Sequence, residues 1–239
     1  MRKKTELITK DIVLAALASA LLSAGKQALV AIPNVEIVTL LIMLYAACFK
    51  PQIAFISTAV FILIECFIWG LNTWVVAYLI HWNFLAFATF LLARVFKIRN
   101  RFVYLAFTIL ATAAFGVLTT AIDAYISWYK SGIAFEKFFV IIYMRGIYFY
   151  IVHIVGNATF NLVLFAPMRL LLEKLMIKYY GKDIFLKEEM PVTKKGSWAP
   201  TSCEVPSSEL TEEEKNGTIP LSVIDQGDAK GEDAINNER

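Results

Sequence analysis

The stretch FVYLAFTILATAAFGVLTTAIDAYISW, residues 102–128, contains a single charged side chain, Asp123. The hydrocarbon core of a bilayer is about 30 Å thick, and an α-helix needs about 20 consecutive apolar residues to cross it. The length and composition of this stretch therefore predict a transmembrane helix. The same criterion identifies further candidates on both sides of it, which are residues 12–32, 35–49, 51–70, 73–96 and 138–172.

The six stretches together predict an all-α integral membrane protein, with six transmembrane helices in a compact bundle. The second stretch is short for a full crossing, so we expect it to be tilted or extended by Pro33 and Asn34. The sixth is longer than one straight crossing requires. Pro167 is expected to end or bend it, because proline removes a backbone hydrogen-bond donor.

Basic residues concentrate at alternate connections between the predicted helices. Cytoplasmic connections of membrane proteins carry an excess of Lys and Arg. With six crossings the richly basic connections all fall on one side, so we expect both termini in the cytoplasm. The residues concerned are Arg2, Lys3, Lys4, Lys10, Lys50, Arg94, Lys97, Arg99, Arg101, Arg169, Lys174, Lys178 and Lys182.

The charge balance divides the chain into two parts. Residues 1–186 form the predicted membrane domain and carry 17 Lys and Arg against 8 Asp and Glu. Residues 187–239 carry 6 against 12 and are rich in Pro, Ser, Thr and Asn, so we expect an acidic, disordered cytoplasmic tail. The overall net charge of +3 averages these two parts and does not indicate a nucleic-acid partner.

Ionisable residues inside membrane helices are costly and usually functional. Here they gather in the outer halves of the predicted helices, and the inner halves contain few. This pattern predicts a pocket open to the outside over an apolar floor, rather than a polar path through the membrane. The residues are Glu36, Glu65, His81, Asp123, Arg145 and His153.

Helical periodicity places further polar and aromatic residues on shared faces. Trp74, Tyr78 and His81 lie on one face of the fourth predicted helix. Asn157 and Asn161 are four residues apart in the sixth, so both amides can point into the bundle. Amides offer hydrogen-bond donors and acceptors, and aromatic rings offer flat surfaces, as recognition of a polar ring-containing molecule requires.

Each of these signals also has a purely structural interpretation. Trp74 is also consistent with an interfacial aromatic belt, and the two asparagines with hydrogen bonding between helices. Asp123 and Arg145 fall at a similar depth and are candidates for an ion pair. The histidines are more typical of a satisfied core than of a metal site. Glu36 at a helix N-terminus is also consistent with a cap that complements the helix dipole.

The first predicted helix carries small residues at every fourth position, Ala16, Ala20 and Ala24. Small side chains at this spacing let another helix approach closely in lipid. The stripe predicts either packing within the bundle or docking to a separate membrane subunit.

These features together resemble the substrate-binding S component of energy-coupling factor (ECF) vitamin transporters. The resemblance covers about residues 8–180 and rests on ALASA at 16–20, IPNVE at 32–36 and GNATFN at 156–161. It implies six helices with both termini inside, an outward pocket that includes Asn157, and a bacterial cytoplasmic membrane. It also implies that Ala16 and Ala20 dock to a transmembrane T component, which two ATPases drive.

The sequence contains no G-x-x-x-x-G-K-[ST] phosphate-binding motif, so any ATP use is assigned to a partner. We expect no catalytic group, cofactor or metal site. The predicted function is capture of an extracellular vitamin or related micronutrient. The alternative is a stand-alone secondary transporter or channel for a small organic solute, and an intramembrane enzyme is the least favoured class.

Overall fold

The computed structural model describes residues 9–131 and 134–181. Within these ranges the regular structure is entirely helical. The predicted tail at 187–239 and the basic residues Arg2, Lys3 and Lys4 lie outside the described residues. The helices are α1 (Thr9–Ala28), α2 (Val38–Cys48), α3 (Pro51–Trp69), α4 (Thr73–Phe90), the π-helical turn η1 (Leu91–Val95), α5 (Arg101–Ser131) and α6 (Phe135–Tyr180).

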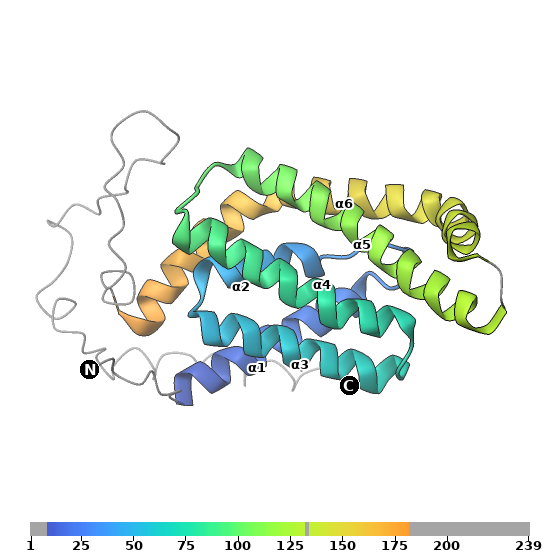
Figure 1. Cartoon of the computed structure of the whole chain (residues 1–239). Helices are drawn as coiled ribbons and strands as arrows, with labels where there is room; N and C mark the ends of the chain where they lie inside the picture. The colour runs from blue at the N-terminus through green and yellow to red at the C-terminus, as the bar shows by residue number, and fades with distance from the viewer. Residues whose placement is uncertain (1–8, 132–133, 182–239) are drawn as a thin grey trace, which may run out of the picture. The chain divides into compact units, whose positions relative to one another are not determined.

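The helices run side by side and reverse direction from one to the next (Figure 1). α1 packs on α3, α3 on α4, α4 on α5 and α5 on α6. α2 lies at the centre and contacts α1, α3, α4 and α6. The bundle is thus arranged around its shortest α-helix.

Five helices are long and apolar enough to cross a bilayer, namely Thr9–Ala28, Pro51–Trp69, Thr73–Val95, Arg101–Tyr129 and Phe135–Tyr180. The chain is therefore a multi-pass helical membrane protein. The second predicted crossing is only the 11-residue α2, about 16 Å long at 1.5 Å per residue. Every residue of α2 is buried. A short helix is tolerated at membrane depth because protein, rather than lipid, surrounds its ends.

The sixth helix does not end at Pro167. An end at this residue was one of the two alternatives predicted from the sequence, and a bend was the other. Pro167 lies inside α6, which continues to Tyr180. The orange C-terminal part of α6 runs in a different direction from its yellow part (Figure 1), as expected for a bend. The continuation is held by the Arg169–Glu173 ion pair (3.0 Å) one turn apart and by the buried side chain of Met176.

Side chains at one end of the bundle tie α6 to the starts of α1 and α3. Asp11 is fully buried there. Lys50 Nζ donates to its Oδ1 at 2.8 Å, and the Tyr180 hydroxyl donates to the same oxygen at 2.6 Å. Arg99 lies 3.6 Å from Glu173. Lys50 from the α2–α3 connection, Arg99 from the η1–α5 connection and Arg169 of α6 thus pair with acidic residues at this end, which we call the basic end.

Candidate functional site

The opposite end of the bundle contains a buried ion pair between Lys26 of α1 and Glu65 of α3. Glu65 is fully buried and the Lys26 side chain is 14% exposed. Lys26 Nζ also donates to the Tyr78 hydroxyl of α4 at 2.9 Å, and lies 4.3 Å from the centre of the Tyr78 ring. Three helices are thus joined around one ammonium group.

This pairing was missed by the sequence reasoning, which treated Lys26 only as a flanking basic residue. The sequence does contain a signal, because Lys26 and Glu36 are the two charged residues in the stretch 12–49. A buried charge requires a partner of opposite sign. Glu65 fits that requirement only once α1 and α3 are known to be neighbours.

A second acidic group, Glu36, lies on the loop between α1 and α2. It forms a 3.1 Å hydrogen bond with His153 Nε2 of α6, and its side chain is 13% exposed. Burial alone raises the pKa of a carboxyl group, but the His153 hydrogen bond and the charge of Lys26 outweigh it, so the pKa of Glu36 lies below its ordinary value. Glu36 is therefore a carboxylate at neutral pH.

The same loop is anchored to α6 by Asn34, whose exposed side chain donates from Nδ2 to the Phe149 carbonyl at 3.1 Å. Asn34 has a φ of 57°, a left-handed conformation that asparagine adopts more readily than most residues. The loop thus holds Glu36 against His153 through a second contact with the same helix.

Aromatic side chains pack around the two acidic residues. Phe115 is the common neighbour of four of these rings. Its ring centre lies 4.8 Å from that of His81, 5.5 Å from that of His153, 5.8 Å from that of Trp82 and 5.9 Å from that of Tyr78. Trp82 and Phe115 were not among the predicted site residues. The structure brings the predicted residues Tyr78, His81 and His153 together around them.

Polar contacts continue deeper between α5 and α6. Asn157 Nδ2 donates to Thr112 Oγ1 at 3.4 Å. One turn further, Asn161 Nδ2 lies 3.9 Å from Met43 Sδ of α2. Both asparagines are buried, as predicted from their spacing. Below them the stacked rings of Tyr104 and Phe165, 4.6 Å apart and almost fully buried, form an apolar floor.

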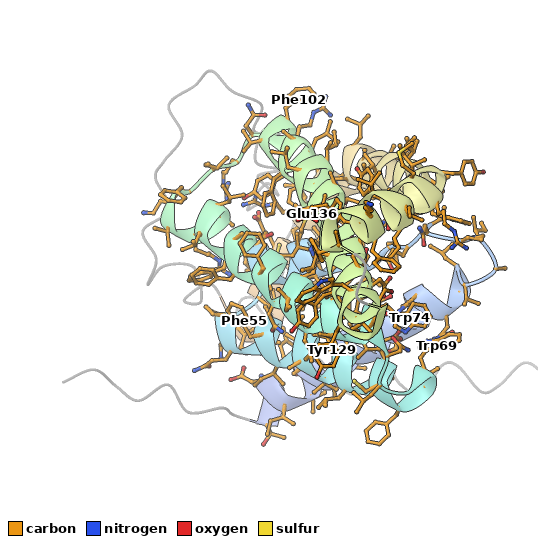
Figure 2. All side chains as sticks on the ribbon, turned by 45° about the vertical axis from the view of Figure 1, so that its right-hand side comes forward. Phe55, Trp69, Trp74, Phe102, Tyr129 and Glu136 are labelled. Atoms are coloured by element: carbon orange, nitrogen blue, oxygen red, sulfur yellow. The ribbon has the colours of Figure 1, made fainter. Side chains whose placement is uncertain are left out.

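Three other predicted residues take part in none of these contacts. Asp123 is half-buried and Arg145 is exposed, and within the described ranges they form no ion pair with each other. Trp74 is 42% exposed and packs edge-on against Trp69 at 5.8 Å. Figure 2 shows this pair lying together, with Phe102 at the opposite side of the view. An exposed tryptophan pair is typical of the membrane interface.

Seven buried side-chain oxygen and nitrogen atoms have no hydrogen-bond partner within the described residues. They are Ser23 Oγ, Gln27 Nε2, Tyr45 Oη, Glu65 Oε1, Trp82 Nε1, Thr89 Oγ1 and Asn157 Oδ1. Leaving such an atom unpaired costs about 1–3 kcal/mol. Two of these atoms, Glu65 Oε1 and Trp82 Nε1, belong to the side chains described above and offer an acceptor and a donor to a polar group. No group of three metal-binding side chains occurs in the described part of the chain.

The Ala16, Ala20 and Ala24 stripe is exposed, whereas the adjacent face of α1 packs on α3. On that packed face Ser57 Oγ donates to the Ala15 carbonyl at 3.3 Å, and Ser19 Oγ to the Ser57 carbonyl at 3.3 Å. Packing within the described bundle therefore uses Ala15 and Ser19 and leaves the stripe facing outward.

Comparison of the chain with protein-family models, curated proteins and solved structures found no match. The fold and the site define the class of the protein as a multi-pass helical membrane protein. At one end of the bundle it holds a buried polar and aromatic cluster. We define this cluster, the ligand cluster, as Lys26, Glu36, Glu65, Tyr78, His81, Trp82, Phe115, His153 and Asn157.

Proposed function

We propose that this protein is the substrate-binding S component of an ECF-type transporter, which binds an extracellular vitamin or related micronutrient. The observation that carries the proposal is the contrast between the two ends of the bundle. The ligand cluster lies at the end opposite the basic end, and the buried Tyr104–Phe165 stack joins α5 and α6 on the other side of Asn157 and Asn161. Such a site receives a molecule from one side of a membrane only.

The proposed orientation places the basic end in the cytoplasm, because Lys and Arg are retained on that side. In this arrangement α2 counts as the second of six crossings, both termini are cytoplasmic, and the ligand cluster faces outward. The proposed location is the cytoplasmic membrane of a bacterium. Asp123, Arg145, Trp74 and Asn34 then lie around the rim of the outward-facing pocket.

Coupling to ATP hydrolysis is proposed to occur through the α1 stripe. Ala16, Ala20 and Ala24 are exposed, and small residues allow a partner helix to approach closely. The partner would be a T component driven by two ATPase subunits, since the chain contains no phosphate-binding motif of its own.

The experiment that tests the proposal combines binding and uptake. The purified chain is screened against a panel of vitamins by thermal shift, and the ligand that stabilises it is followed into cells. We expect uptake of that ligand to require both this chain and an ECF module. Uptake by cells that lack the module would contradict the proposal.

The second candidate is a stand-alone secondary transporter or channel. The observation in its favour is that polar contacts extend to Thr108 and Asn161, both of which contact Met43 Sδ, at 3.3 and 3.9 Å. Transport by this chain alone in proteoliposomes, driven by an ion gradient, would support this candidate.

A further inference from the structure

The ligand cluster contains two carboxylates and one ammonium group. Glu36 and Glu65 are its carboxylates, and Lys26 is its ammonium group. Lys26 pairs with Glu65, whereas Glu36 pairs with an imidazole, His153 Nε2 at 3.1 Å. Among the ion pairs of the described residues, Glu36 has no Lys or Arg partner.

The two carboxylates differ in what they offer to a ligand. Glu65 is fully buried and is already neutralised by Lys26. Glu36 is 13% exposed and is hydrogen-bonded to the His153 ring. Glu36 is therefore the carboxylate without an ammonium or guanidinium partner, and it is also the more accessible of the two.

Aromatic faces lie next to this charge. The rings of His81, Phe115 and His153 form a continuous group beside Glu36, with centres 4.8 and 5.5 Å apart. A cation over an aromatic face is stabilised by the ring's quadrupole. The protein already uses this contact once, since Lys26 Nζ lies 4.3 Å from the centre of the Tyr78 ring.

We propose that the ligand of this site is an organic cation that carries its positive charge on or beside a flat ring, with Glu36 as its counter-ion. The inference rests on the proposed function and names its substrate class. The uncovered polar atoms, Glu65 Oε1 as acceptor and Trp82 Nε1 as donor, provide further contacts for polar substituents of the ring. An anionic ligand would meet a carboxylate that has no ammonium or guanidinium partner, and is disfavoured.

Two matched sets of probes test the charge preference on the purified full-length chain. 1-Methylnicotinamide, nicotinamide and nicotinate share a ring and are a cation, a neutral molecule and an anion. Benzyltrimethylammonium, benzyl alcohol and benzoate form the second set. Isothermal titration calorimetry should show that the cation of at least one set binds at least about tenfold more tightly than its neutral and anionic partners.

Variants assign the preference to Glu36. Glu36→Gln should weaken binding of the cation about tenfold or more, because it removes the counter-ion. Glu36→Asp should retain the preference for the cation. Glu173→Gln at the basic end is the matched control and should bind like the original chain.

The result that overturns the inference is equal or tighter binding of the neutral or anionic probe. An unchanged preference in Glu36→Gln would do the same, and so would the failure of both cations to bind saturably up to about 10 mM. If Glu36→Gln does not fold, the comparison within each probe set on the original chain, together with Glu36→Asp, still decides the matter.

The inference and the proposed function fail differently. If an anionic vitamin binds here and its uptake requires an ECF module, the function stands and the ligand class is wrong. If cations bind but uptake proceeds without the module, the ligand class stands and the proposed function is wrong.

Discussion

Lys26 and Glu65 form an ion pair that joins the C-terminal end of α1 to that of α3. The Glu65 side chain is fully buried, and the Tyr78 hydroxyl of α4 accepts a second hydrogen bond from Lys26. In a low-dielectric interior each charge depends on the other, because an unpaired buried ion costs several kcal/mol. This pair is the polar centre around which the proposed ligand site is built.

Breaking the pair from one side should destabilise the bundle strongly. We expect Glu65→Gln and Lys26→Met each to lower the free energy of unfolding by about 3 kcal/mol, since the remaining partner is left buried and alone. The double variant should lose clearly less than the sum. Unfolding in mixed SDS–detergent micelles measures these differences. Lys174→Gln, on an exposed part of α6, serves as control and should change stability by less than about 0.5 kcal/mol.

Two glycines of α6 should respond oppositely to alanine. A Cβ at Gly146 would lie 2.7 Å from Tyr150 Cζ and from its hydroxyl oxygen, which is 2.7 Å from Thr120 Oγ1 of α5. Gly146→Ala should therefore displace Tyr150 and cost about 1–3 kcal/mol. At Gly156 the nearest atom would be 3.8 Å away, so alanine there should be neutral or slightly stabilising. Equal effects of the two substitutions in the same unfolding assay would show that the α5–α6 contact is looser than described.

The basic end should depend on the hydroxyl of Tyr180. Tyr180→Phe removes the 2.6 Å hydrogen bond to the buried Asp11 carboxylate, and we expect a loss of about 1.5–3 kcal/mol, as is usual for hydrogen bonds to charged groups. Tyr179→Phe is the matched control, because its hydroxyl makes an exposed 3.3 Å bond to the Lys10 carbonyl. A smaller effect of Tyr180→Phe than of Tyr179→Phe would argue against the observed anchoring of α6.

The Glu36 carboxylate should give the bundle a pH dependence in acid. Its pKa is lowered in the folded protein, chiefly by His153 and Lys26 working against burial. A lowered carboxyl pKa contributes stability that is present above the unfolded value of about 4.3 and is lost as the pH falls through the folded value. Between pH 7 and pH 3, the thermal unfolding temperature should therefore fall less steeply in Glu36→Gln than in the original chain. Parallel curves for the two proteins would contradict this assignment.

Much of the helix pattern could be predicted from hydropathy alone, because a long apolar run can satisfy its backbone in lipid only as a helix. The predicted 51–70 corresponds to α3, Pro51–Trp69. The length of α2 could not be predicted, since it depends on how the surrounding helices cover Val38–Cys48. The course of α6 beyond Pro167 depends likewise on contacts such as the Tyr180 bond to Asp11.

The candidate site could be predicted in part. Glu36, Glu65 and His153 were identified because ionisable groups are rare in membrane helices. Their partners depend on helix order and register, which one sequence does not specify. Sequence position therefore could not assign Lys26 to Glu65 or His153 to Glu36, and it gave no reason to select Phe115 as the common neighbour of the rings.

The central claim is that this chain binds substrate and depends on a partner that docks on α1. The most direct measurement is co-purification of the tagged chain with a co-expressed T component and ATPases, before and after Ala16→Arg with Ala20→Arg. Ala59→Arg on the exposed face of α3 controls for an arginine facing lipid. We predict that the α1 double variant folds but loses the T component and ATPases, whereas Ala59→Arg retains them. Retention of the complete complex by the α1 double variant would contradict it.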